Sequence, residues 1–381
     1  MERKRLGDIA TYINGFPFKP EDRGTDGLPI IRIQDLTGNA YDIGYYNGDY
    51  PKRIEINNGD VLISWSASLG VYIWSRGKAL LNQHIFKVIF DKTDVNKQYF
   101  VFAVQHKLKE MESKTHGATM KHIVKKDFDN TMIPFTALGK QREIAEILSK
   151  VSGAIEARKH ELQQLDNLIK ARFVEMFGDP KYNPNGYVLK AMGSLVKDII
   201  PGWSANGEAR QKGTDEKAVL KVSAVTQGFF KPEEYKALPA DMEIKKYVYP
   251  HKGDLLFSRA NTRELVGATA IIEDDYPDLI LPDKLWRVLF SNDLSVYYAK
   301  YVLSSESIRA EFSAQSTGTS GSMFNVSAEK FRNIAIPVPP KELQKAFEAF
   351  IRQVNKTKSV IQKSLDETKL LFDSLMQQYF G

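Results

Sequence analysis

Two stretches of the chain carry apolar residues at a regular spacing of three or four positions, with Lys and Glu between them. In the first stretch these residues are Ile144, Leu148, Val151, Ile155, Leu162, Leu165 and Ile169. In the second they are Phe347, Phe350, Val354, Ile361, Leu365 and Leu371. Such spacing lays one apolar stripe along an α-helix, and that stripe must be buried against a partner. The pattern predicts amphipathic helices over 139–178 and 339–381.

Both predicted helices are unusually long. About 38 helical residues measure roughly 57 Å, well beyond a typical helix in a globular core. Each stripe is the obvious partner for the other, so an antiparallel coiled coil is the favoured interpretation. In the competing interpretation each helix lies on its own domain, which would leave much of so long a stripe uncovered.

The sequence before each helix has a different texture. The runs PIIRI, VLISW, GVYIW and IFKVIF are rich in β-branched and aromatic residues, and Gly, Asn and Asp separate them. This composition predicts strands joined by turns. Helical patterns also occur over 98–113 and 296–312. Each part that precedes a long helix is therefore predicted to be a mixed α+β domain.

The chain repeats itself. MIPFTALGKQREIAEIL in the first half is answered by AIPVPPKELQKAFEAF in the second. The separation is 203 residues between Pro134 and Pro337, and again between Gln141 and Gln344. Further upstream, NNGDVLIS is answered by HKGDLLFS, and LNQHIFKVIF by LPDKLWRVLF. A unit of about 190 residues far exceeds the period of stacking repeats. We therefore expect two similar domains, related by an approximate internal twofold axis.

Composition narrows the class of protein without defining it. The 53 basic and 47 acidic residues give a formal charge of +6, which permits a polyanionic partner but does not demand one. The absence of cysteine excludes disulfides and thiolate chemistry, and suits a cytoplasmic protein. No apolar run approaches the length of a membrane span, and MERKRLGDIA lacks the apolar core of a signal peptide.

Catalytic motifs are missing from the sequence. It contains no P-loop, no G-x-S-x-G elbow and no H-E-x-x-H pair, and its six histidines show no metal-ligand spacing. The run 183–186, Asn-Pro-Asn-Gly, matches the methyltransferase pattern Asn-Pro-Pro-aromatic for two residues only, so we interpret it as a turn. His84 is predicted to be structural, and Asp283 and Lys284 to be surface charge. A single-chain enzyme is disfavoured.

Two kinds of polar segment are candidates for contact with DNA. One follows the GD-(V/L)-L strand, as SWSAS in the first copy and SRANTRELVG in the second, where side chains suited to base edges differ between the copies. The other is THGATMKHIVKK, answered by STGTSGSMFNVSAEK, whose small residues would let phosphates approach closely. An ordinary surface loop is the competing interpretation for the second kind. The full candidate set is Lys19, Arg32, Trp65, Ser66, Ser68, Arg76, Lys78, His116, Thr119, Lys121, Lys221, Arg259, Asn261, Arg263, Thr317, Thr319 and Ser320.

The order of these motifs resembles the DNA-sequence specificity (S) subunit of type I restriction–modification systems. The resemblance rests on GDVLIS, LNQHIFKV, TMIPFTALGKQREIAEIL and IKARFVEMFGDP, followed by a divergent second copy that ends AIPVPPKELQKAF…YFG. It covers essentially the whole chain. The first junction reads TALGKQ where the family usually has the double proline that the second copy keeps in PPKELQ, so the first junction is expected to bend differently.

The resemblance implies a non-catalytic subunit that reads a bipartite, asymmetric site in double-stranded DNA. Its target-recognition domains would be 1–138 and 190–338, joined by the linker 179–189 and by the spacer helices 139–178 and 339–381. It further implies two DNA adenine methyltransferase (modification) subunits as partners, and restriction subunits in a cleaving complex. S-adenosylmethionine, ATP and Mg would bind to those partners, with no cofactor in this chain. The alternative is a duplicated protein-interaction scaffold without direct DNA contact.

Overall fold

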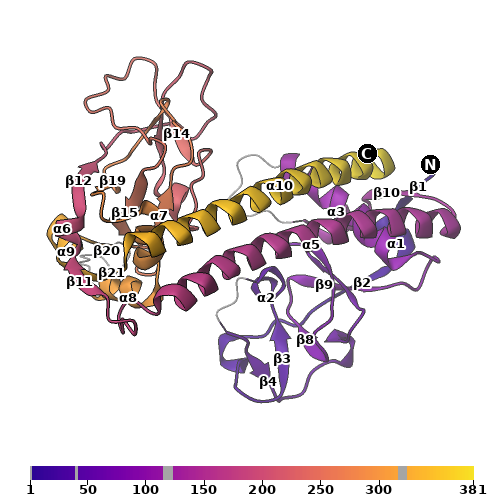
Figure 1. Ribbon diagram of the computed structural model, residues 1–381. Helices are drawn as coiled ribbons and strands as arrows, with labels where there is room; N and C mark the ends of the chain where they lie inside the picture. The colour runs from indigo at the N-terminus through magenta and orange to yellow at the C-terminus, as the bar shows by residue number, and fades with distance from the viewer. Residues whose placement is uncertain (1, 39–41, 115–122, 316–323) are drawn as a thin grey trace. The chain divides into compact units, whose positions relative to one another are not determined.

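The computed structural model describes residues 2–38, 42–114, 123–315 and 324–381 (Figure 1). The chain divides into two compact units. The first unit comprises Met1–His160 with Gln362–Gly381, and the second comprises Glu161–Ile361. Among the described residues, no helix combines the length and apolar character that a membrane crossing requires.

The first unit combines three small sheets with short helices. β1 pairs with β10, and two four-stranded sheets have the orders β2-β9-β6-β7 and β4-β3-β8-β5. The strands are β1 Glu2–Arg5, β2 Thr11–Asn14, β3 Leu28–Ile31, β4 Tyr45–Tyr46, β5 Glu55–Ile56, β6 Val61–Ser64, β7 Gly70–Ile73, β8 Ala79–Leu81, β9 Ile85–Ile89 and β10 Met132–Phe135. The helices are α1 Leu6–Ile9, η1 Pro20–Asp22, α2 Ile33–Thr37, η2 Lys52–Ile54, α3 Lys97–Lys114 and α4 Lys125–Asp129.

The second unit repeats this arrangement. β11 pairs with β21, and the larger sheets have the orders β12-β19-β15-β17 and β14-β13-β18, with an added pair β16-β20. The strands are β11 Val188–Ala191, β12 Val196–Pro201, β13 Ala218–Leu220, β14 Tyr235–Ala237, β15 Leu255–Ser258, β16 Ala260–Asn261, β17 Thr269–Ile271, β18 Leu279–Ile280, β19 Leu285–Phe290, β20 Phe324–Asn325 and β21 Ala335–Val338. The helices are α6 Met192–Leu195, η3 Val222–Val225, α7 Val296–Leu303, α8 Glu306–Gln315 and α9 Ala328–Asn333.

An equivalent, partly buried ion pair supports the central sheet of each unit. Lys87 Nζ on β9 lies 3.0 Å from the Asp60 carboxylate, and Arg287 Nε on β19 lies 2.6 Å from that of Asp254. Burial raises the pKa of Asp254, although the backbone N–H of His251 and the guanidinium of Arg287 both oppose that rise. The GD motif therefore recurs because the aspartate ties the start of one strand to its neighbour in both sheets.

The two long helices are α5, Leu138–Phe177, and α10, Lys341–Phe380. Inside the first unit, Ile144 near the start of α5 shares a buried cluster with Phe380 at the end of α10. Inside the second, Phe177 at the end of α5 packs on Phe347 near the start of α10. Within each unit, half of α5 therefore lies beside half of α10 in antiparallel direction (Figure 1).

Polar contacts between the two helices agree with this packing. Arg158 Nε donates to Ser364 Oγ over 2.9 Å, and Lys358 Nζ lies 2.6 Å from the carboxylate of Asp166. The mixed α+β class and the antiparallel pairing of the long helices are confirmed. The competing interpretation, with each helix folded onto its own domain alone, is wrong because each apolar stripe meets the other helix.

A buried glutamine fastens the start of each long helix. Gln141 accepts a hydrogen bond from Asn96 N at 2.9 Å and donates to Thr136 O at 2.7 Å. Gln344 accepts from Ser295 N at 2.8 Å and donates to the carbonyl of Pro339 at 2.9 Å. The expectation that the first junction differs is not met in this respect, because TALGKQ and PPKELQ present the same fastening. Each amide ties its junction to the loop before α3 or α7.

Two equivalent glycines mark close backbone approaches. A Cβ at Gly15 would overlap the backbone oxygen of Asn82, and a Cβ at Gly202 would overlap that of Leu281. Gly153, in contrast, is exposed in the interior of α5 with open space around it. We therefore expect Gly15→Ala to lower the free energy of unfolding by about 1–3 kcal/mol. Gly153→Ala should raise it by about 0.5–1 kcal/mol, since alanine is the better helix former.

Urea unfolding of the two variants beside the parent chain measures both effects. The positions are matched in chemistry, because each change adds one methyl group to a glycine. Equal stability of the Gly15→Ala and Gly153→Ala variants would show that the backbone near Gly15 can accommodate a methyl group.

Candidate nucleic-acid interface

The turn after β6 lies against the turn before β9. The backbone N–H of Trp65 donates to His84 O at 3.3 Å, and the N–H of Ile123 donates to Trp65 O at 3.1 Å. The indole of Trp65 stacks on Phe86 with ring centroids 5.6 Å apart, and it meets the His84 ring edge-on at 5.4 Å. Hydrogen bonds therefore hold the backbone of Trp65 on both sides, while its side chain rests on an aromatic platform.

Arg259 occupies the same position in the second unit. Its backbone N–H donates to Lys284 O at 3.0 Å, and Val326 N donates to Arg259 O at 2.8 Å. The guanidinium lies 5.7 Å above the ring of Trp286, which stands in β19 where Phe86 stands in β9. The two units thus share one backbone arrangement but present an indole in one and a guanidinium in the other.

Both kinds of predicted loop meet at these positions. Ile123 and Val326, which bond to Trp65 and Arg259, lie within the second kind of polar segment. Six candidates on those segments lie outside the described residues, namely His116, Thr119, Lys121, Thr317, Thr319 and Ser320. The described ends show that each of those segments returns beside the turn that follows β6 or β15.

Sequence reasoning missed several polar side chains that surround Trp65. Trp65 Nε1 donates to Asn14 Oδ1 at 3.2 Å, and Gln83 Nε2 lies 3.1 Å from His84 Nε2. His84 is half-buried beside the indole, so it belongs to this polar cluster as well as to the fold. In the second unit Asp283 and Lys284 stand where the first has Gln83 and His84. The repeat of LNQHIF as LPDKLW is the sequence signal that could have identified Gln83 and His84 as candidates.

The neighbouring candidates in the two turns shape the turns or extend from them. Ser66 is buried, and Ser68 uses its carbonyl to accept a hydrogen bond from the hydroxyl of Ser64 at 2.6 Å. Asn261 Oδ1 accepts from the backbone N–H of Thr262 at 2.9 Å. Arg263 is exposed, and its Nε donates to Ser313 Oγ at 3.3 Å. Arg263 is thus an exposed side chain that contacts α8 through Ser313.

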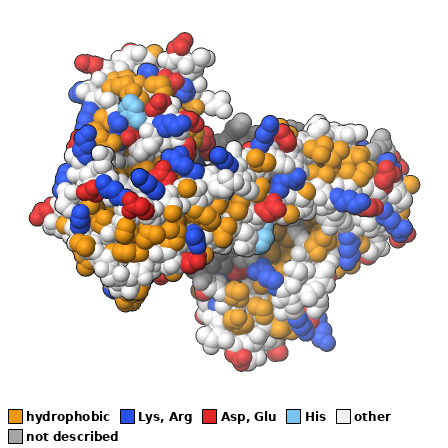
Figure 2. Space-filling model, in the orientation of Figure 1, with side chains coloured by type: hydrophobic (Ala, Val, Ile, Leu, Met, Phe, Trp, Pro, Cys, Tyr) orange, Lys and Arg blue, Asp and Glu red, His pale blue; other side chains and the backbone are white. Residues whose placement is uncertain are grey.

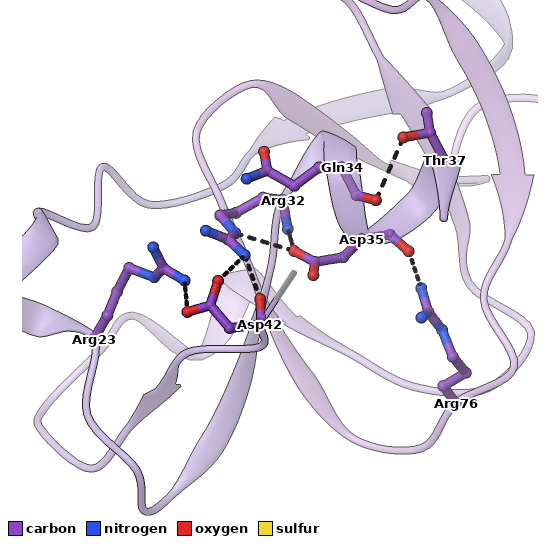
Figure 3. A network of polar contacts seen from close by, with 7 residues as sticks. All are labelled: Arg23, Arg32, Gln34, Asp35, Thr37, Asp42 and Arg76. Carbon is purple, nitrogen blue, oxygen red and sulfur yellow. Dashed lines mark hydrogen bonds and ion pairs between the residues drawn. The ribbon is translucent and has the colours of Figure 1, made fainter. Parts of the chain in front are cut away.

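Arg32 and Arg76 hold the short helix α2 in place, as Figure 3 shows. Arg32 Nε donates to the buried carboxylate of Asp35 at 3.1 Å, and the guanidinium also reaches Asp42. Arg76 donates to the backbone oxygen of Asp35 at 2.7 Å. The side chain of Arg32 is only 14% exposed. Both arginines thus use hydrogen-bond donors within the domain. Gln34 on α2, in contrast, is exposed.

The three candidate lysines among the described residues each lie near a carboxylate. Lys19 Nζ is 3.8 Å from Glu21, and Lys221 Nζ is 3.4 Å from Glu234. Lys78 Nζ is 2.8 Å from Glu55, and that hydrogen bond raises the pKa of Lys78. Exposed pairs of this kind exchange partners cheaply, so these lysines remain predicted phosphate contacts of modest strength.

Charge on the face shown in Figure 2 is mixed rather than concentrated. Figure 2 shows Lys and Arg interspersed with Asp and Glu over the face in view. Within the described residues, no three His, Cys, Asp or Glu side chains gather as a metal site would require. The face in view therefore carries no broad patch of a single charge (Figure 2).

The sequence matches a protein-family model and several known proteins. The family model described as type I restriction modification DNA specificity domain matches residues 1–167 and again 206–369. The specificity subunit of the type I restriction enzyme MjaVIII from Methanocaldococcus jannaschii is 23% identical, over 95% of this chain and 88% of that protein. The EcoKI specificity subunit from Escherichia coli K12 is 22% identical, over 98% and 86% respectively. The EcoBI specificity subunit is 30% identical, but the match covers only 44% of this chain and 36% of that protein.

Solved structures agree on the fold. The S subunit of a type I restriction–modification system from M. genitalium superposes with a TM-score of 0.54 at 13% identity, over 100% of this chain and 96% of that one. A chain from a structure that addresses complex assembly and conformational transition of the type I system gives 0.52 at 16% identity, over 99% and 97%. The two matched segments of the family model together span most of the sequence. This chain belongs to the type I restriction modification DNA specificity domain family.

Proposed function

We propose that this protein is the non-catalytic subunit that selects the DNA sequence for a type I restriction–modification enzyme. Each unit would read one half of a bipartite site in duplex DNA. The observation that carries this proposal is the shared backbone position of Trp65 and Arg259, where two similar folds present different side chains. Different side chains at equivalent backbone positions support an asymmetric DNA site with two unlike halves.

The long helices would set the distance between the two half-sites. The recognition domains are 1–138 and 190–338, the spacer helices 139–178 and 339–381, and the linker 179–189. Both α5 and α10 run unbroken through 40 residues and contribute to the buried core of both units. A continuous helix is far stiffer than a loop, so a helix pair is suited to act as a spacer.

Partner subunits would carry out the methylation and cleavage reactions. Two modification subunits would bind S-adenosylmethionine, flip the target adenine out of the stack and methylate it. Restriction subunits would add ATP- and Mg-dependent cleavage. The assembly would work in the cytoplasm, where the DNA is. The related structure that addresses assembly of the type I system supports partners of this class.

Exchange of one recognition domain tests the proposal. A chimaera with residues 1–138 replaced by the equivalent domain of a relative should change one half of the methylated sequence and leave the other half intact. The measurement is the map of methylated adenines in DNA from cells that co-express the chain with its modification subunit. The parent chain is the control, and a change in both halves would contradict modular reading.

The map of methylated adenines also distinguishes the proposed function from the competing one. A protein-interaction scaffold without DNA contact would leave the methylated sequence unchanged after the exchange. A steep salt dependence of duplex binding by the assembled complex would also distinguish direct DNA recognition from such a scaffold.

A further inference from the structure

Arg259 carries a charge that the described residues leave unpaired. Several other arginines of the second unit have acid partners, such as Arg210 with Glu216 at 2.6 Å and Arg352 with Glu348 at 2.8 Å. Within the described part of the chain, no carboxylate comes within ion-pair distance of Arg259, and its buried Nε has no hydrogen-bond partner. Because no described carboxylate neutralises the guanidinium, its charge is available to an external acceptor.

The position of Arg259 is fixed more firmly than that of an ordinary surface arginine. Its N–H and C=O are both hydrogen-bonded to neighbouring segments, at 3.0 and 2.8 Å, and its guanidinium faces the ring of Trp286. This cation–π contact and the two backbone hydrogen bonds restrain the side chain, so less conformational freedom is lost when the guanidinium binds a ligand. Lys284, whose carbonyl accepts from Arg259, places a second basic residue beside it.

We infer that Arg259 is the specificity-determining residue of the second unit and donates two parallel hydrogen bonds to O6 and N7 of a guanine in the major groove. This inference rests on the proposed function. A planar fork matches that pair of acceptors, which no other base presents in the major groove. A phosphate offers a similar pair of oxygens, but the compact charge of Lys284 is sufficient for a phosphate, whereas the restrained fork of Arg259 suits a base.

The first unit cannot make the same contact at the equivalent position. The indole of Trp65 has one donor, and that donor is directed at Asn14 Oδ1. The two half-sites must therefore be read with different chemistry at one structurally equivalent place. The guanine read by Arg259 should have no counterpart read by Trp65.

The test uses the full chain assembled with its modification subunits and a DNA library randomised in both half-sites. With the parent chain, methylation should require guanine at one position of one half-site. Arg259→Met keeps the aliphatic stem on Trp286 but removes the fork, and should reduce the preference for guanine about 5- to 150-fold. Arg259→Lys keeps the charge and should keep only part of that preference. Trp65→Ala is the matched control, and should alter the other half-site alone.

The opposite pattern identifies a phosphate contact. If Arg259→Met weakens binding equally for all sequences and lowers the salt slope by about one, while Arg259→Lys restores binding fully, the inference is overturned. An unchanged Tm of the variants shows that the fold is intact. Failure of the parent complex to select any sequence would instead contradict the proposed function, so the two failures are distinguishable.

Discussion

Inserting seven residues into both long helices should lengthen the spacer of the recognised DNA sequence by about 3 base pairs. The insertions belong between His160 and Glu161 in α5 and between Ile361 and Gln362 in α10, where the chain passes from one unit to the other. Seven helical residues add roughly 10 Å, and B-form DNA rises 3.4 Å per base pair. A heptad also turns the helix by only about 20° from its former face, so the apolar stripes stay aligned. Mapping of methylated sites measures the spacer directly.

Insertion into α5 alone is the matched control. The contacts of Arg158 with Ser364 and of Lys358 with Asp166 come from opposite sides of the insertion point. When only one helix is lengthened, the two contacts and the apolar stripes on both sides cannot all be kept. Sequence-specific methylation should then be lost. If either insertion left the spacer unchanged, the helices would not set the distance between half-sites.

Phe347→Ala should lower the free energy of unfolding by about 3–5 kcal/mol. The side chain is fully buried where α10 meets α5 and α7. Its ring lies 5.6 Å from that of Phe173, 5.4 Å from that of Phe177 and 5.4 Å from that of Tyr301. Truncation would leave a cavity at the centre of this aromatic cluster, and the rigid helices around it limit relaxation. Urea unfolding monitored by circular dichroism measures the loss.

An exposed apolar residue of the same helix provides the comparison. Val360 is 71% exposed, so Val360→Ala should change stability by no more than about 0.5 kcal/mol. A similar loss for both variants would indicate that helix propensity, rather than packing against α5, dominates the stability of α10.

The long helices and the duplication could be predicted because their signals are local or strictly periodic. The apolar positions of α5 repeat every three or four residues regardless of what they contact. The separation of 203 residues between Gln141 and Gln344 persists because both glutamines fasten a junction of the same length. The runs VLISW and IFKVIF likewise correspond to β6 and β9. The predicted helix over 296–312, however, is divided into α7 and α8.

The arrangement of the candidate site could not be predicted, since it depends on pairing between distant strands. Asn14 and His84 meet Trp65 only because β9 pairs with both β2 and β6. Arg32 was a candidate on charge alone, and its contact with Asp35 becomes visible only when the turn into α2 is known. Its role in DNA binding remains a prediction, as do those of the other candidates. Patterns of residue type do not reveal which charges are already compensated.

The hydrogen bonds that anchor Trp65 and Arg259 come from peptide groups, which every residue except proline supplies in full. A mutation at either place would consequently exchange the side chain while the surrounding backbone keeps its supports. If these side chains read DNA as proposed, a single substitution at either position would alter the recognised sequence without loss of the backbone hydrogen bonds that support the fold.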